Sequence, residues 1–283
     1  MVAFSPIIRS VIFPVERNSI YTFNKELSLS RNLLIDKMQK LSKNENIDPF
    51  VLLDQGSKRY PQAIKDGLNV ANDLNNIKKN EGYYMPLALE IENELLDGKL
   101  DVSADGDVIF YPNKASSKKA GKLPIHMTAS IVKTLSSLIF HLKYLSVQEE
   151  LIILDEPEMN LHPDSQVLLA RLLGKLLNSG LRLLISTHSD YIVRELNNMV
   201  MADSIVNEGK KIPEACDYDE ETRISKEDIG VYYFSYLKKK KVEVRNVVVD
   251  NNGFDVPSID DTIAKQNKAA EDLYYTLKYG SDE

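Results

Sequence analysis

Two adjacent carboxylates directly follow an apolar run in the segment LIILDEPEMNLHP, and their types and spacing suit chemistry on a phosphate. The run at 151–154 is bounded by polar residues, a pattern typical of a β-strand buried on both faces. Such a strand delivers Asp155 and Glu156 to its carboxyl end, where open α/β sheets bind their ligands. One carboxylate can hold Mg²⁺ through water while the next orients an attacking water, so the pair indicates hydrolysis of a phosphoanhydride.

A second apolar run, at 181–187, is followed by His188. A helix predicted over 163–179 separates the two runs, with Pro163 in its first turn and Gly180 just past its end. Buried strand, helix and buried strand at this spacing predict a parallel α/β sheet. If the two strands are neighbours, the imidazole reaches the crevice that holds the carboxylates, where it can contact a terminal phosphate.

These motifs resemble those of the ABC-type ATPases, which include the chromosome-maintenance, RecF-like and overcoming-lysogenization-defect heads. DEPE followed by NLHP is similar to the Walker B aspartate, catalytic glutamate and D-loop of that group, and STHSD is similar to its switch-histidine segment. The likeness is greatest to bacterial single-chain AAA-type proteins with this core, many of them in phage-defence operons. FPVERNSI at 13–20 and SIDDTIAKQNKAAEDLYY at 258–275 are similar to segments of the same proteins.

The resemblance implies ATP and Mg²⁺ as cofactors and a role for each residue of the motifs. Asp155 would bind Mg²⁺, Glu156 would act as general base toward water, and His188 would stabilise the γ-phosphate. A module of this kind powers or gates another activity, here one expected on DNA or on a phage-defence effector.

The resemblance also implies contacts with nucleotide held by an opposite subunit. A helix is predicted to follow Thr128, and its N-terminus, with free backbone N–H groups and the hydroxyl of Ser130, would reach that nucleotide. The segment TASIVK departs from the glycine-containing signature usual in this group. Asn160 and His162, in the D-loop-like segment, would also face the opposite subunit. For His162, which precedes Pro163 at a helix start, a capping role is the alternative.

The phosphate-binding loop of the group, GxxxxGK[ST], does not occur in the sequence. Four Gly-Lys pairs begin at residues 98, 121, 174 and 209, and none has a glycine five positions earlier. Such a loop supplies several charge-assisted phosphate contacts, each worth about 1.5–3 kcal/mol. We therefore expect the chain to begin inside the family's fold, to lack its N-terminal lobe and to bind ATP weakly by itself.

Two functions follow from these observations. The first is an ATP-binding and ATP-hydrolysing module that becomes active when another segment or chain supplies the phosphate loop. The second is a non-catalytic interaction or scaffold protein that keeps the ATPase fold without binding nucleotide. The expected partners are further copies of the chain or a protein that supplies the missing lobe, together with an effector protein or DNA.

Composition excludes several other classes of protein. The 283 residues are 43% hydrophobic and 27% charged, close to the averages of globular proteins. The single cysteine excludes a disulfide framework and a CxxC metal site. A net charge of −7 disfavours broad coating of nucleic acid. No apolar run approaches the ~18 residues of a membrane span, so we expect a cytoplasmic chain that does not enter the membrane.

The fold class expected is α/β: an ABC-ATPase-like (P-loop NTPase) parallel-sheet core, a helical and hairpin insertion, and a C-terminal strand pair plus helix. Residues 1–20 and 119–250 would form the incomplete core, 21–118 the insertion and 251–283 a helical tail. In the insertion, a hairpin is predicted to turn at Asp105-Gly106. Helices are predicted over 24–43, 61–79 and 86–96.

Four further predictions concern two helix caps, one strand pair and one arginine. Thr128 is expected to cap the helix that it precedes. A strand pair is expected to turn near Lys238–Lys241, and the last helix to open at Ser258 with Asp261 three residues on, as in a capping box. Arg17 is expected to form an ion pair, with a phosphate contact as the alternative.

Overall fold

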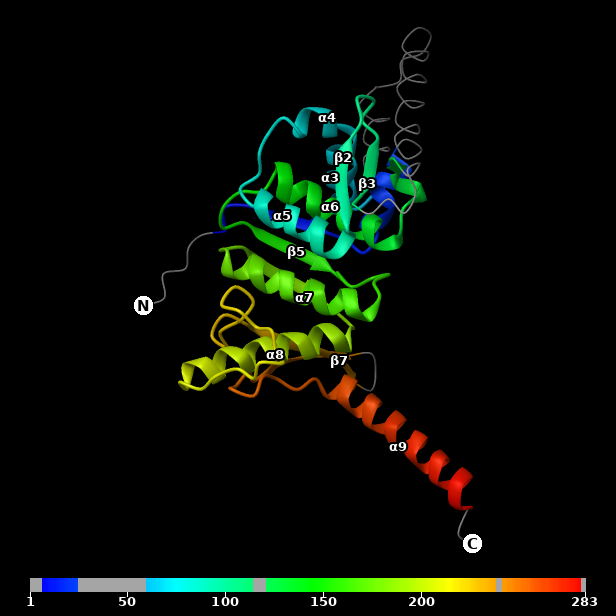
Figure 1. Cartoon of the computed structure of the whole chain (residues 1–283), viewed down its shortest axis with the longest axis vertical. Helices are drawn as coiled ribbons and strands as arrows, with labels where there is room; N and C mark the ends of the chain where they lie inside the picture. Colours follow the sequence, from blue (N-terminus) through cyan, green and yellow to red (C-terminus); the bar gives the residue numbers. More distant parts are fainter. Residues whose placement is uncertain (1–6, 25–59, 114–120, 238–240, 281–283) are drawn as a thin grey trace. The chain divides into compact units, whose positions relative to one another are not determined.

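The computed structural model describes residues 7–24, 60–113, 121–237 and 241–280 (Figure 1). Contacts within the chain divide it into two compact units, residues 1–189 and 190–283. The predicted domain boundaries at residues 20, 118 and 250 follow the family resemblance instead, and they stay a prediction. The helix predicted over 24–43 falls almost wholly outside the described residues.

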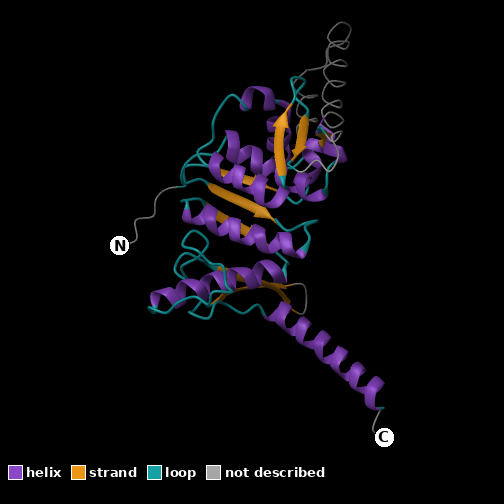
Figure 2. Cartoon of the chain, viewed as in Figure 1, coloured by secondary structure: helices purple, strands orange, loops and turns teal. Residues whose placement is uncertain are grey.

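Three parallel strands form the core sheet of the first unit (Figure 2): β1 (Ser10–Phe13), β5 (Leu151–Asp155) and β6 (Arg182–Ser186). Their order is β1-β5-β6, so β5 lies in the middle. The register pairs Phe13 with Leu154 and Asp155 with Ser186, which places the carboxyl ends of the strands at one edge. The predicted parallel α/β core is confirmed, and the two apolar runs do form neighbouring strands.

The two apolar runs differ in burial. In β5, Ile152 and Leu154 are at most 2% exposed, as expected for a central strand. In β6, Leu184 is 56% exposed, so the prediction of a fully buried strand is wrong here. The physical reason is position: within the described residues, β6 has a hydrogen-bonded neighbour on one side only.

Helices α6 (Ser130–Tyr144) and α7 (Pro163–Asn178) lie on opposite sides of this sheet (Figure 1). The predicted stripe of α6 is buried, and Leu135, Leu138 and Leu142 are at most 2% exposed. Its cap differs from the prediction: Ala129 is the N-cap residue, while the Thr128 hydroxyl donates to the carbonyl of Ile125 at 2.7 Å. The hydroxyl thus closes the preceding turn of 3-10 helix and is not available to α6.

The segment predicted as the insertion, together with residues 123–124, forms a small sheet and, within the described residues, several helices. The predicted hairpin is confirmed: β2 (Gly98–Val102) pairs antiparallel with β3 (Val108–Pro112), and Gly106 in the turn has φ +84°. A short strand, β4 (Leu123–Pro124), pairs with β3. The helices predicted over 61–79 and 86–96 are each found as two pieces: α3 (Gln62–Asn72) and α4 (Leu74–Ile77), then α5 (Met85–Ile91) and the π-helix η1 (Glu92–Leu96).

A buried polar cluster, which we call the junction, connects this insertion to α6. The Lys143 ammonium donates to the Glu92 carboxylate at 2.7 Å and to the carbonyl of Leu100 at 2.9 Å. The same carboxylate oxygen accepts from the amide of Leu100 at 2.6 Å. Burial lowers the pKa of Lys143, and its bond to Glu92 opposes that shift. The junction therefore fixes the π-helix and β2 against the helix that begins at Ser130.

The second unit holds α8 (Asp190–Asn207), a β7–β8 hairpin (Val231–Leu237 and Lys241–Val247) and α9 (Pro257–Tyr279). The hairpin is confirmed, although residues 238–240 of its turn are outside the described ranges. Helix α9 begins at Pro257 with Val256 as N-cap residue, so the predicted cap at Ser258 is wrong. Proline occupies the first helical position because its fixed φ suits it and its missing N–H costs nothing there.

None of the helices in the described ranges is both long and apolar enough to cross a membrane.

Candidate active site

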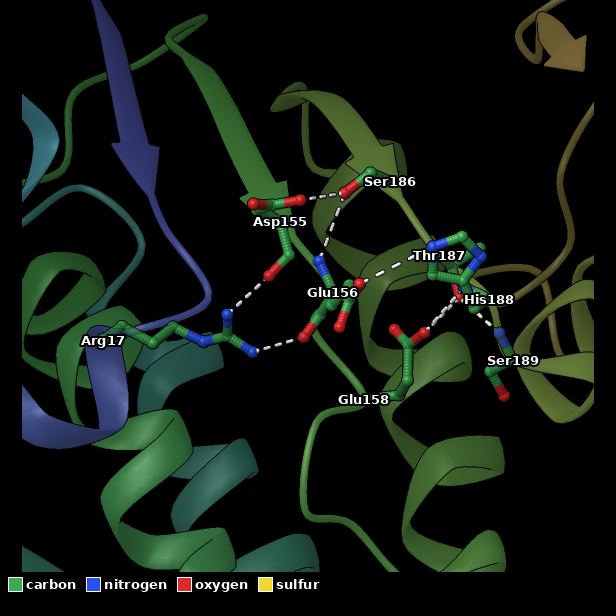
Figure 3. Close-up of polar contacts among 8 residues, drawn as sticks. All are labelled: Arg17, Asp155, Glu156, Glu158, Ser186, Thr187, His188 and Ser189. Carbon is green, nitrogen blue, oxygen red and sulfur yellow. Dashed lines mark hydrogen bonds and ion pairs between the residues drawn. The ribbon is translucent and has the colours of Figure 1, made fainter. Parts of the chain in front are cut away.

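The carboxyl ends of β5 and β6 carry a group of polar residues that we call the strand-end site (Figure 3). Its members are Asp155, Glu156, Glu158, Ser186, Thr187 and His188. Ser186 stands opposite Asp155 in the strand register, and its hydroxyl donates to the Asp155 carboxylate. The amide of Glu156 donates to the carbonyl of Ser186 at 3.0 Å, which extends the ladder one residue past β5. The paired strands therefore set the direction of the Asp155 side chain.

Glu156 turns the chain sharply at the end of β5. Its φ is +43°, a left-handed conformation that costs a residue with a side chain roughly 1–3 kcal/mol. The turn brings its carboxylate to 3.6 Å from Nε2 of His188. The imidazole is 89% exposed and the Glu156 side chain 33%. Neighbouring strands thus bring the carboxylate and the histidine together at an open edge, as the sequence predicted.

Arg17 fixes the end of β5 through hydrogen bonds to backbone carbonyls. Its side chain follows β1 and is 2% exposed. The guanidinium donates to the carbonyl of Asp155 at 2.6 Å, to that of Glu156 at 2.7 Å and to that of Pro14 at 3.1 Å (Figure 3). The prediction of an ion pair is therefore wrong. The N–H groups of the planar guanidinium match the successive carbonyls of a tight turn, and they do not bind the carboxylates of the same residues.

Burial and the neighbouring carboxylates have opposite effects on the pKa of Arg17. Burial lowers the pKa of Arg17, and the nearby carboxylates of Glu158, Asp155 and Glu156 raise it. A guanidinium stays protonated in proteins. Its positive charge therefore lies near three carboxylates to which it donates no hydrogen bond.

Glu158 is a member of the strand-end site that sequence reasoning missed. It is 8% exposed, and its Oε1 accepts from the Thr187 hydroxyl at 2.7 Å and from the amide of His188 at 3.0 Å. Its Oε2 is buried without a hydrogen-bond partner among the described residues. The Thr187 hydroxyl in turn accepts from the amide of Ser189 at 3.0 Å. Glu158 thus fixes the backbone that carries the histidine, and the only sequence signal for it was the second glutamate of DEPE.

The other predicted binding residues lie on neighbouring elements. Ser130 is the first residue of α6 and is exposed, and Asn160 is exposed with φ +63°. His162 is the N-cap residue of α7, and its Nδ1 accepts from the amide of Asp164 at 3.4 Å, so this residue does cap the helix. None of the hydrogen bonds and ion pairs found in the described ranges joins these three residues to the strand-end site. Their contact with nucleotide stays a prediction.

The donor set of the strand-end site fits a hydrated Mg²⁺ better than a metal enclosed by protein. No group of three or more His, Cys, Asp or Glu that could hold a metal is found within the described residues. Mg²⁺ is commonly held by one or two carboxylates, several waters and the phosphates of a substrate. Asp155, oriented by the Ser186 hydroxyl at the sheet edge, supplies such a carboxylate.

These features define a class of protein: a parallel α/β fold that presents acidic residues and a histidine at the carboxyl edge of its sheet. A comparison with protein families matches residues 22–193 to the AAA ATPase domain. Since this match covers more than half of the chain, the chain belongs to the AAA ATPase domain family. The matched range includes β5, β6 and the whole strand-end site. A search of curated proteins found no match.

Proposed function

We propose that the chain is the ATP-binding and ATP-hydrolysing module of an ABC-type ATPase. The observation that carries the proposal is the approach of the Glu156 carboxylate to the His188 imidazole, 3.6 Å apart beside Asp155. The edge is open, because the imidazole is 89% exposed. A base, a cationic or hydrogen-bonding group and a metal-binding carboxylate are the groups that hydrolysis of a phosphoanhydride requires at one place.

Each residue of the strand-end site then has a role. Asp155 would hold Mg²⁺, which would supply positive charge to the phosphates of the substrate. Glu156 accepts a proton from the attacking water, and His188 donates a hydrogen bond to the γ-phosphate oxygens. Arg17 and Glu158 position these groups: the first holds the turn at Glu156, the second holds the loop at His188.

The phosphate loop comes from another segment or chain in this proposal. The free edge of β6 supports it: among the described strands only β5 pairs with β6, and Leu184 is 56% exposed there. A parallel strand added at this edge ends beside Ser186, where a loop that follows it meets Asp155. Ser130, Asn160 and His162 contact nucleotide on an opposite subunit, so pairing of modules and hydrolysis are coupled. Pairing of the modules, coupled to hydrolysis, then gates a DNA-related or phage-defence effector.

Titration calorimetry of the chain with MgATP tests the proposal, with the Asp155→Asn variant as its partner experiment. We expect weak binding, because the phosphate loop is absent from this sequence, and loss of that binding in Asp155→Asn. The exposed Asp228, in the second unit, offers the matched control Asp228→Asn, which should bind as the wild type does. Binding that persists in Asp155→Asn contradicts the proposal, and so does the absence of binding up to millimolar MgATP when a protein that supplies the phosphate loop is present.

A scaffold function without nucleotide is the second candidate. The specific observation in its favour is that none of the twelve glycines begins a GxxxxGK[ST] loop. A chain that binds no MgATP, alone or with partner proteins, and still forms a stable complex with them would establish it.

A further inference from the structure

Helix α9 exposes nearly all of its side chains. From residue 261 to residue 279 every side chain is exposed except that of Ile263, which is half-buried. Leu273 and Leu277 are 66% and 88% exposed. Helices in proteins gain most of their stability by packing an apolar face against a neighbour, so a helix without such packing is much less stable. A helix of 23 residues with leucines on its surface therefore needs a partner surface to be stable.

Four apolar residues and one glutamine of α9 follow the 3.5-residue repeat of a coiled coil. Steps of three, four, three and four residues connect five positions, which we call the α9 seam: Ile263, Gln266, Ala270, Leu273 and Leu277. In the sequence, Ile259 continues the same spacing toward the N-terminus. These are alternating a and d positions of heptads. A 3.5-residue repeat keeps one stripe facing a second helix through supercoiling, so the repeat indicates that the partner surface is itself a helix.

The charges of α9 favour an identical partner helix. The positions that flank the seam between Ile263 and Leu277 carry no charge: Asn267, Ala269, Tyr274 and Thr276. Coiled coils that select a different partner use complementary charges at these flanking positions. Uncharged flanks let two copies of α9 pair without like charges in contact. In a parallel pair in register, Gln266 meets its own counterpart, and a single polar residue at a core position fixes register.

The face of α9 opposite the seam is occupied within the helix itself. Tyr275 stacks on Tyr279 with ring centroids 5.9 Å apart. Tyr275 is 52% exposed, close to the exposure of Leu273. Position 275 is on the far side of the helix from the seam, which makes it a matched control for changes in the seam.

We propose that α9 pairs with α9 of a second copy of this chain through the α9 seam, as a two-stranded coiled coil that forms without nucleotide. This contact is independent of the nucleotide-dependent pairing proposed above. It holds two modules at a high effective concentration, which favours any further contact between them.

Sedimentation of the full chain without nucleotide tests the proposal. Reductant is present throughout, because Cys216 is exposed. The wild type should sediment at twice its mass of 32.1 kDa. Leu273→Glu and Leu277→Glu should each weaken the dimer by at least ~100-fold, since each puts two charges into one buried seam. Tyr275→Glu should leave the dimer unchanged. Gln266→Leu should tighten it by about tenfold, because a polar core residue reduces stability.

Four results would overturn the proposal. A wild type that stays monomeric at the highest attainable concentration assigns the seam to another chain. A dimer that neither leucine variant weakens uses another surface. Equal weakening by Leu273→Glu and Tyr275→Glu makes the effect one of helix stability. A dimer that Gln266→Leu loosens has no buried Gln266 at its centre. Circular dichroism of each variant confirms that it retains its helices, and none of these outcomes bears on MgATP binding.

Discussion

Two regions of the first unit bury a cation near carboxylates, and they do so in opposite ways. In the junction, Lys143 donates directly to the Glu92 carboxylate, and both side chains are at most 2% exposed. In the strand-end site, Arg17 donates to the backbone carbonyls of Asp155 and Glu156. The charges of the junction neutralise each other, whereas the cation of the site leaves its neighbouring carboxylates unbound.

The difference separates a structural cluster from a reactive one. A buried ion pair that also bonds the backbone fixes one arrangement of the chain, and its burial keeps it from contact with a ligand. A cation that binds the backbone instead positions the turn and attracts the carboxylates without occupying them. Asp155 and Glu156 therefore keep oxygens available for a metal ion and a water at the open edge of the sheet.

Breaking the junction should have the largest effect. Lys143→Met leaves the Glu92 carboxylate buried without its cation, and we expect the free energy of unfolding to fall by about 3–5 kcal/mol in denaturant titrations. Removing both partners in Glu92→Leu/Lys143→Met should recover most of that loss, since no buried charge remains. Lys133→Met, on the same helix and half-buried, is the control and should change stability by less than about 0.5 kcal/mol. Equal losses of stability in Lys143→Met and Lys133→Met would contradict this interpretation.

The pH dependence of stability sharpens the same point. Burial lowers the pKa of Lys143 below its ordinary value of 10.5. Between the lowered pKa and 10.5 the unfolded chain binds more protons than the folded chain, so this lysine makes the free energy of unfolding rise with pH across that window. Relative to Lys143→Met, the wild type should gain stability as the pH rises toward 10.5. A difference that does not change with pH would show that burial does not shift this pKa.

Changing the base of the strand-end site should abolish most turnover. In a preparation that hydrolyses MgATP, alone or with a partner that supplies the phosphate loop, Glu156→Gln should lower the rate by at least about 100-fold. An amide cannot accept the proton of the attacking water, but it keeps the size of the side chain, so MgATP binding should persist. Phosphate release and calorimetry measure the two quantities. Undiminished hydrolysis in Glu156→Gln would remove this residue from the mechanism.

Removing the Arg17 side chain should lower the free energy of unfolding by less than breaking the junction does. Arg17→Met leaves the carbonyls of Asp155 and Glu156 without their donors, and we expect a loss of about 2–3 kcal/mol in the free energy of unfolding. Arg9 offers a matched control, because its guanidinium donates to the carbonyl of Leu145 at 3.0 Å on the exposed surface. Arg9→Met should cost less than about 1 kcal/mol. Equal costs would show that the buried bonds of Arg17 have no special weight.

Glu158 should show the smallest effect when its shape is preserved. Glu158→Gln keeps a carbonyl oxygen that accepts from the Thr187 hydroxyl and the His188 amide, so stability should change by about 1 kcal/mol or less. Glu158→Ala loses both bonds, and hydrogen exchange at the His188 amide should then accelerate at least about tenfold. Equally fast exchange in the Gln variant would mean that charge, not hydrogen bonding, holds this loop.

The sequence predicted the strands of the site well because its signals there are local. The apolar runs at 151–154 and 181–187, with one helix between them, require parallel strands. Parallel strands end at one edge, so the sequence groups Asp155, Glu156 and His188 if the two strands are neighbours, and the structure confirms that they are. Local signals were less reliable for caps: Thr128 and Ser258 both have suitable side chains, but a 3-10 turn and a proline decide where α6 and α9 begin.

The remaining parts of the site depended on distant segments. Arg17 is 138 residues from Asp155, and its type alone does not distinguish a bond to a carboxylate from one to a carbonyl. Glu158 lies 30 residues from His188, whose amide it fixes. The partners of Lys143 likewise lie 43 and 51 residues away. Such pairings depend on how the elements pack, which local patterns do not encode.

By itself the sequence determined the class of fold, the two strands that end in reactive groups and the identities of those groups, because periodicity and turn residues act over a few positions of the chain. Only the tertiary structure decided which carboxylate pairs with a buried cation and which carboxylates do not. That outcome depends on the direction and burial of side chains from segments far apart in the chain. It is set when β1 and the insertion pack around β5 and α6, which leaves Lys143 against a carboxylate and Arg17 against the backbone.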